Sequence, residues 1–170
     1  MRTLKKLTIK NFKSIREQTI EPGLLNIFIG GNGVGKSNLI EVFRFLREIV
    51  NQNLGGYTAQ KGGADKLLHF GRKKSSRMEL SLEFGEGDTS NAYDIKLNGA
   101  DDDSLVIFAE SIFYHEKNRY KTPWDKTVSS FAKESLTTSI KDSTTANTLA
   151  FSTPVFLAIS LTTSAFVIFN

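Results

Sequence analysis

The chain has 170 residues, of which 39% are hydrophobic and 24% charged, and its formal net charge is +4. This length and composition predict one soluble globular unit and exclude wholesale disorder. The absence of cysteine excludes disulfides, thiolate metal sites and cysteine nucleophiles, and a total of two histidines argues against a histidine-rich zinc site. No apolar signal-peptide core follows the basic N-terminus, so we expect a cytoplasmic protein.

The first third of the chain predicts a strand, a turn, a second strand and a helix. Apolar residues separated by lysines predict a strand over residues 4–12, and Pro22 with Gly23 predicts a turn. The nearly continuous apolar run at residues 24–29 is typical of a strand that is buried on both faces. From Ser37 onward, apolar residues recur at helical spacing, which predicts an amphipathic helix that ends near residues 51–53.

The middle of the chain changes from a helical period to a period of two residues. Apolar and polar residues alternate over residues 78–84 and again over residues 93–98, which predicts two half-buried strands. Asn98 and Gly99 form a strong turn signal, and residues 105–108 predict another strand. We therefore expect an antiparallel β meander after the first strand–loop–helix unit.

The charged residues are unevenly distributed. Residues 61–77 carry six lysines and arginines against Asp65 alone, whereas residues 86–110 carry seven acidic residues against Lys96 alone. Such a basic cluster is typical of a solvated loop, and it can also contact phosphate groups. Both interpretations stay open for residues 61–77.

The last part of the chain, residues 127–170, is rich in serine and threonine and carries no charged residue after Asp142. Residues 149–169 have the length that spans a bilayer, but six serines and threonines, Pro154 and the lack of a flanking basic residue argue against a membrane partner. Three interpretations of this tail stay open: a membrane anchor, buried strands of a larger assembly, and a product of truncation or frameshift. We assign no structure to it.

The most specific motif is Gly-Gly-Asn-Gly-Val-Gly-Lys-Ser at residues 30–37, which matches the P-loop pattern G-x-x-x-x-G-K-S/T completely. The predicted strand precedes it and the amphipathic helix follows it, as a P-loop requires. Glycines let backbone N–H groups turn inward around phosphate oxygens, and the helix N-terminus adds unsatisfied donors. We expect Lys36 to reach the β- and γ-phosphates of a nucleotide and the Ser37 hydroxyl to ligate Mg²⁺.

Two segments carry a family resemblance: Leu-Thr-Ile-Lys-Asn-Phe-Lys-Ser at residues 7–14, and the P-loop region at residues 25–38. Together they resemble the N-terminal part of ABC-type, AAA-family ATPases of the RecF, structural-maintenance-of-chromosomes and overcoming-lysogenization-defect kind. The resemblance implies an α/β fold for residues 1–126, the first lobe of an ATP-binding head. In that lobe a mixed sheet carries the P-loop helix together with an antiparallel β meander.

The resemblance also implies ligands and their contacts. We expect ATP and Mg²⁺ as cofactors, Ser37 as the metal ligand, and no catalytic residue in this chain. In such proteins the Asn-Phe-Lys-Ser segment lies near the nucleotide, which adds two secondary contacts to those of the P-loop. The expected nucleotide-binding residues are Gly30, Asn32, Gly33, Val34, Gly35, Lys36, Ser37, Asn38, Asn11 and Lys13.

Hydrolysis in this family requires two heads, and the P-loop of one head faces the signature motif of the other. The sequence lacks a Ser-Gly-Gly signature and a Walker B strand ending in Asp-Glu, and the nearest match, residues 105–110, has Ala109 at the Asp position. We therefore expect a truncated lobe that binds ATP but does not hydrolyse it alone. A homodimer or a partner chain would supply the signature motif and the switch histidine, and the expected setting is DNA repair or phage defence, with DNA as a further partner.

Two alternative functions stay open, and each belongs to another class of protein. The first is a non-catalytic nucleotide-binding module that a partner chain completes. The second is a small P-loop kinase, although the downstream region offers only Arg119 for an arginine-rich lid. A GTPase is excluded, because the Asp-x-x-Gly and Asn-Lys-x-Asp elements do not occur.

Overall fold

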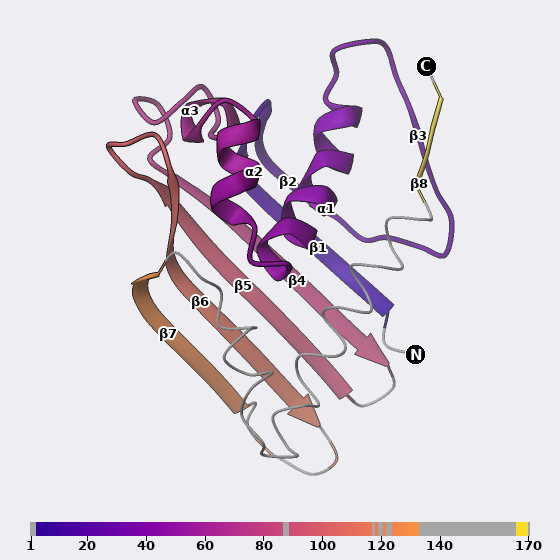
Figure 1. Ribbon diagram of the computed structural model, residues 1–170. Helices are drawn as coiled ribbons and strands as arrows, with labels where there is room; N and C mark the ends of the chain where they lie inside the picture. Colours follow the sequence, from indigo (N-terminus) through magenta and orange to yellow (C-terminus); the bar gives the residue numbers. More distant parts are fainter. Residues whose placement is uncertain are drawn as a thin grey trace.

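The computed structural model describes residues 3–86, 89–116, 118, 121, 124–132 and 166–169. Within these residues, a six-stranded antiparallel sheet carries three helices on one of its faces (Figure 1). The sheet contains, in spatial order, β2 (Ile15–Ile20), β1 (Thr3–Phe12), β4 (Arg77–Glu86), β5 (Thr89–Gly99), β6 (Leu105–Glu116) and β7 (Trp124–Ala132). The sheet therefore joins an N-terminal hairpin to the expected meander, which is confirmed.

The helices follow one another along the chain between β3 and β4. They are α1 (Lys36–Val50), α2 (Leu54–Gln60) and α3 (Ala64–Leu67). A second sheet pairs β3 (Asn26–Ile29) in parallel with β8 (Phe166–Phe169), apart from the main sheet (Figure 1). The expectation of a single mixed sheet is therefore wrong: the antiparallel strand pairs form one sheet, and the parallel pair of β3 and β8 forms another. Both edges of β1 are occupied, by β2 and β4, so β3 has no place beside it.

One face of the main sheet is buried and forms a single core with the helices. Side chains alternate between buried and partly exposed positions along β4 and β5, as expected for an antiparallel sheet with one covered face. In β1, Leu4 and Leu7 are both buried although they are three residues apart. The pairing register with β4 shifts between Leu4 and Lys6, and this irregularity returns Leu7 to the buried face.

The prediction that β3 is buried on both faces is wrong. Its Ile27 and Ile29 are 52% and 81% exposed, and Leu24 in the preceding turn is 94% exposed. Asn26 exchanges hydrogen bonds of 2.9 and 3.0 Å with the backbone of Gly23, and this turn precedes a strand outside the main sheet. An apolar run predicts a strand, but it does not show which layers cover that strand.

The helix α1 forms as its periodicity predicts, with its apolar side packed into the core. Phe45 is fully buried at its centre. The Phe45 ring lies 5.7 Å from the ring of Phe12 on β1 and 5.7 Å from the ring of Tyr57 on α2, measured between centroids. This row of aromatic rings fixes α1 between the sheet and α2.

Glu41 joins α1 to two other segments. Its carboxylate accepts a hydrogen bond of 3.1 Å from the Tyr57 hydroxyl, and it pairs with the ammonium groups of Lys61, at 2.7 Å, and of Lys13. Burial acts to raise the pKa of Glu41, but the hydrogen bonds from Lys13 and Lys61 outweigh it, and the pKa falls to about 2. Burial and the adjacent Glu41 carboxylate raise the pKa of Tyr57. One carboxylate therefore holds α1, the β1–β2 turn and the end of α2 together.

Residues 133–165 of the predicted tail lie outside the described residues, so the three interpretations of the tail stay untested. Of the described part, β7 crosses residue 126, the expected boundary of the first lobe, and β8 lies within the tail. None of the three described helices has both the length and the hydrophobicity that crossing a bilayer requires.

Phe45→Ala should lower the free energy of unfolding by about 3–5 kcal/mol, because it deletes a buried ring and leaves a cavity between β1, α1 and α2. Urea unfolding followed by circular dichroism measures this change. Leu24→Ala is the control, since the Leu24 side chain is 94% exposed, and it should change the stability by less than about 0.5 kcal/mol. Equal effects of the two substitutions would contradict the packing of α1.

The Glu41 carboxylate should make the stability depend on pH. Its folded pKa, about 2, lies below the ordinary value of 4.5, so it contributes about 3 kcal/mol above pH 4.5, and this contribution is lost as the pH falls towards 2. Glu41→Gln should therefore be less stable than the wild type at pH 7, and the difference should disappear near pH 2. Thermal unfolding of both proteins between these pH values measures it.

Glu83→Gln is the control for this pH dependence, because it removes an exposed carboxylate that lies 3.5 Å from Lys6. An exposed pair of this kind contributes little, so the Glu83→Gln protein should follow the wild type within about 1 kcal/mol at every pH. A loss of stability in Glu41→Gln that stays constant with pH would show that the carboxylate charge is not the cause.

Candidate phosphate-binding site

The P-loop connects β3 to α1, and its backbone turns at two glycines. Gly33 and Gly35 have φ values of 86° and 101°, a left-handed conformation that favours glycine. Gly35 is also the N-cap of α1, and the first helical hydrogen bond runs from the Leu39 N–H to the Gly35 carbonyl, at 3.0 Å. The first N–H groups of α1 therefore have no intrahelical acceptor, as an anion-binding helix N-terminus requires.

Lys36 is the first residue of α1, and its side chain folds back over the loop. Its ammonium donates hydrogen bonds to the carbonyls of Gly30 and Gly31, the latter at 2.9 Å. An ammonium has three donors, so one N–H of Lys36 is left for a ligand. The two loop carbonyls thus place a positive charge at the phosphate-binding segment.

Ser14, in the β1–β2 turn, contacts the loop from outside the motif. Its hydroxyl oxygen accepts a hydrogen bond of 2.7 Å from the Asn38 amide. A Cβ atom at Gly35 would lie 3.3 Å from the same oxygen, so the neighbouring hydroxyl and the positive φ both favour glycine there. Ser14 is not among the predicted site residues, although the Asn-Phe-Lys-Ser segment ends with it.

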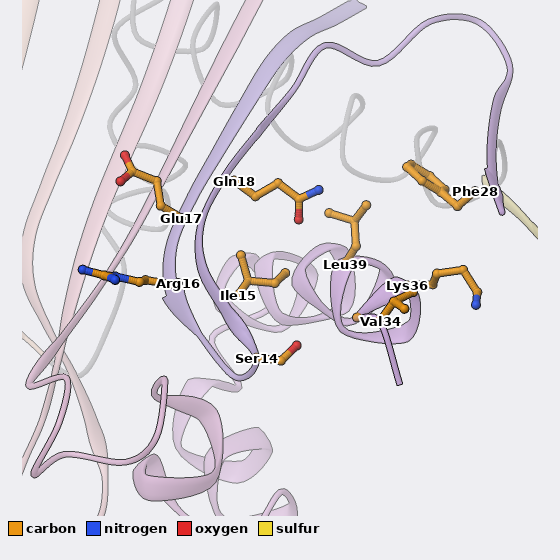
Figure 2. A pocket seen from close by; sticks show the side chains of 10 residues that line it. Ser14, Ile15, Arg16, Glu17, Gln18, Phe28, Val34, Lys36 and Leu39 are labelled. Atoms are coloured by element: carbon orange, nitrogen blue, oxygen red, sulfur yellow. The ribbon is translucent and has the colours of Figure 1, made fainter. Parts of the chain in front are cut away.

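A cavity of about 300 Å³ adjoins the P-loop between β2, β3 and the start of α1 (Figure 2). Ser14 and Lys36 border it, and Ile15, Phe28 and Leu39 line it with apolar side chains. Its volume is at the lower end of the range for small-molecule sites. Groups that can donate hydrogen bonds to a phosphate therefore lie next to a cavity with a partly apolar lining.

Three consecutive polar residues of β2 also line this cavity: Arg16, Glu17 and Gln18. In Figure 2, Gln18 extends towards Leu39, whereas Arg16 and Glu17 extend away from α1. The Glu17 carboxylate lies 2.8 Å from the Lys10 ammonium, and this hydrogen-bonded neighbour lowers the pKa of Glu17. Gln18 is thus the polar side chain of β2 that is directed at the cavity.

The other predicted P-loop residues lie at the surface. Asn32 and Val34 are exposed in the loop, and Ser37 is exposed at the start of α1. Within the described residues, the Ser37 hydroxyl has no hydrogen-bond partner, and no cluster of three or more histidines and carboxylates could hold a metal ion. A hydroxyl such as that of Ser37, together with phosphate oxygens, is a ligand set that suits Mg²⁺.

Of the two secondary residues, Asn11 lies near the end of β1 and Lys13 in the β1–β2 turn, with φ values of 58° and 49°. The Asn11 amide donates a hydrogen bond of 2.9 Å to the Arg77 carbonyl, and the Lys13 ammonium pairs with Glu41. Neither residue is among the described ones that line the cavity beside the P-loop. Their contact with a nucleotide stays a prediction.

Comparison with known proteins agrees with this geometry. Residues 3–153 match the model of a family described as AAA ATPase domain. Over 104 residues, the chain is 32% identical to the DNA replication and repair protein RecF of Renibacterium salmoninarum. That alignment covers 57% of this chain and 25% of the relative, so the matched region spans about a quarter of the relative's length. The resemblance to RecF-like ATPases is confirmed: the chain is similar to RecF over this region, and it belongs to the AAA ATPase domain family.

Proposed function

We propose that this chain binds Mg-ATP at the P-loop and acts in the cytoplasm as part of a RecF-like ATPase. The observation that carries the proposal is the arrangement around Gly35: a left-handed helix cap, the Lys36 ammonium bound over the loop, and a cavity that both residues border. A triphosphate needs backbone donors and a cation in one place, and a nucleoside needs a cavity beside them. The loop and the cavity offer both.

In the proposed complex, the phosphates contact the N–H groups of the P-loop and of the first turn of α1, where the helix dipole favours negative charge. The remaining N–H of Lys36 donates to the β- and γ-phosphates, and the Ser37 hydroxyl ligates Mg²⁺. The nucleoside enters the cavity, where Ile15 and Phe28 offer apolar contacts. The Gln18 amide offers one hydrogen-bond donor group and one acceptor to the base.

Hydrolysis requires a group that activates water, and the carboxylates of Glu17, which lines the cavity, and of Glu41, on α1, are already paired. Glu17 binds Lys10, and Glu41 binds Lys13 and Lys61. We propose that a second head, in a homodimer or on a partner chain, supplies the signature motif and completes the ATPase. By similarity to a DNA replication and repair protein, the assembled ATPase would act on DNA, in repair or in phage defence.

Lys36→Ala should weaken the binding of Mg-ATP by about tenfold or more, because it removes a charged donor whose hydrogen bonds contribute about 1.5–3 kcal/mol each. Isothermal titration calorimetry compares the dissociation constants of the wild type and the variant. Lys5→Ala is the matched control, since Lys5 is an exposed lysine of β1 outside the cavity, and it should bind as the wild type does. Equal affinities of the Lys36→Ala protein and the wild type would refute a P-loop site.

The chain alone should bind Mg-ATP without turnover. Monomeric protein, isolated by size exclusion, should release phosphate from ATP no faster than the Lys36→Ala variant does, because the second head is absent. A phosphate-release assay under saturating ATP measures both rates. Rapid hydrolysis by the monomer that Lys36→Ala abolishes would show a complete enzyme and contradict the need for a second head.

A further inference from the structure

The β1–β2 turn, formed by Lys13 and Ser14, borders the cavity beside the P-loop. The Ser14 side chain lines this cavity and is bound to Asn38 in the first turn of α1, and its hydroxyl lies close to Gly35. Lys13 has a φ of 49°, a left-handed conformation that is unfavourable for a lysine, so the surroundings must hold the turn in place. The contacts of this turn therefore determine where Ser14 lies relative to the P-loop.

One side of the turn is held by the segment after α2. The Lys13 N–H donates a hydrogen bond of 2.8 Å to the Leu67 carbonyl, and the His69 N–H donates one of 3.1 Å to the Asn11 carbonyl. The His69 Nδ1 atom also lies 2.7 Å from the Lys13 carbonyl. Contacts from residues 67–69 thus fix the backbone of the turn on this side.

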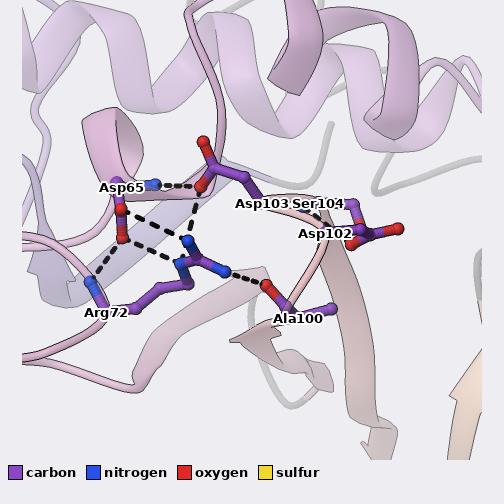
Figure 3. Close-up of polar contacts among 6 residues, drawn as sticks. All are labelled: Asp65, Arg72, Ala100, Asp102, Asp103 and Ser104. Carbon is purple, nitrogen blue, oxygen red and sulfur yellow. Dashed lines mark hydrogen bonds and ion pairs between the residues drawn. The ribbon is translucent and has the colours of Figure 1, made fainter.

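The same segment is anchored to the main sheet by an ion-pair cluster (Figure 3). The Arg72 guanidinium donates hydrogen bonds to the Asp65 carboxylate, at 2.9 Å, and to the Ala100 carbonyl. It also lies 3.5 Å from the Asp103 carboxylate. Ala100 and Asp103 belong to the connection between β5 and β6. This side of the β1–β2 turn is therefore connected to the main sheet.

The other side of the turn is held by the Glu41 carboxylate on α1. Its Oε2 atom pairs with the Lys13 ammonium, whereas its Oε1 atom accepts a hydrogen bond of 3.1 Å from the Tyr57 hydroxyl and lies 2.7 Å from the Lys61 ammonium. The Lys61 ammonium also lies 5.2 Å from the centre of the Tyr57 ring. Because the Glu41 side chain is only 14% exposed, water screens these contacts weakly. Lys61 and Tyr57 therefore fix the direction in which the carboxylate points at Lys13.

We propose that Glu41 and Lys61 are positioning residues for the nucleotide site, a role that rests on the proposed binding of Mg-ATP at the P-loop. Lys61 orients the Glu41 carboxylate, and this carboxylate holds Lys13. The turn that is held in this way keeps Ser14 at the start of α1. Neither Glu41 nor Lys61 is among the described residues that line the cavity, so both act on the nucleotide through the turn. A ligand that needs the turn in place binds more weakly when the turn is in place for a smaller fraction of the time.

Lys61→Met should weaken the binding of Mg-ATP by at least about threefold in isothermal titration calorimetry, although residue 61 lies outside the cavity. Lys61→Arg should bind within about twofold of the wild type, since it keeps a cation that can pair with Glu41. Lys66→Met is the matched control, because Lys66 is an exposed lysine of α3 outside the Glu41 cluster, and it should bind as the wild type does. Equal affinities of the Lys61→Met protein and the wild type would overturn the proposal.

The double variant Glu41→Gln/Lys61→Met tests whether Lys61 acts through the carboxylate. It should bind Mg-ATP as weakly as Glu41→Gln alone does, because an uncharged residue 41 leaves Lys61 without its role. Circular dichroism at the assay temperature checks that both proteins are folded. Two effects that multiply would show that Lys61 acts independently of Glu41, and this result too would overturn the proposal.

Amide hydrogen exchange, followed by NMR without nucleotide, separates the positioning of the turn from the nucleotide proposal and from general stability. In Lys61→Met the Lys13 amide, which is bonded to Leu67, should exchange at least about threefold faster than in the wild type. The amide of Ile95, in the interior strand β5, should be unchanged. An unchanged rate at Lys13, or an equal rise at Ile95, would overturn the proposal. A wild type that binds no Mg-ATP would refute the nucleotide proposal, and the exchange rates would still decide whether Lys61 holds the turn.

Discussion

The arrangement around the P-loop depends on the paired carboxylate of Glu41. The lysine of the β1–β2 turn, and a tyrosine and a lysine from α2 and its end, converge on this one group, which belongs to the helix that begins at the P-loop. A partly buried carboxylate without cations would carry a large desolvation cost, so the partners are required as well as attracted. The position of the phosphate loop relative to Ser14 follows from these contacts.

The two sheets differ in how far the described residues cover them. The buried face of the six-stranded sheet packs against the helices in one core, whereas β3 leaves Ile27 and Ile29 exposed beside the P-loop. Apolar side chains exposed side by side in this way are unfavourable in water, and in soluble proteins they often mark a contact with another surface. The second head that the proposed ATPase requires is one surface that could cover β3.

Most elements of the fold are predictable from the sequence because their patterns are local. The alternation in β4 and β5 and the helical period of α1 each extend over enough residues to identify the element and its buried side. The P-loop is predictable because its motif is contiguous. The contacts of Lys13 with Glu41 and of Ser14 with Asn38 are not, since they join residues 28 and 24 positions apart that only the tertiary fold brings together. Likewise, apolar composition could not show that β3 lies outside the main sheet.

Ser14 lines two hollows, the cavity beside the P-loop and a groove that Lys66 and Phe70 also line, and its hydroxyl accepts a hydrogen bond from Asn38 at the start of α1. A ligand that displaced this hydroxyl from one side would change the surroundings, and so the binding free energy, of a ligand on the other side. Thermodynamic linkage makes such an effect reciprocal: each ligand alters the dissociation constant of the other by the same factor. A single hydroxyl group is thus placed where it can couple two occupancies, without any movement of the sheet.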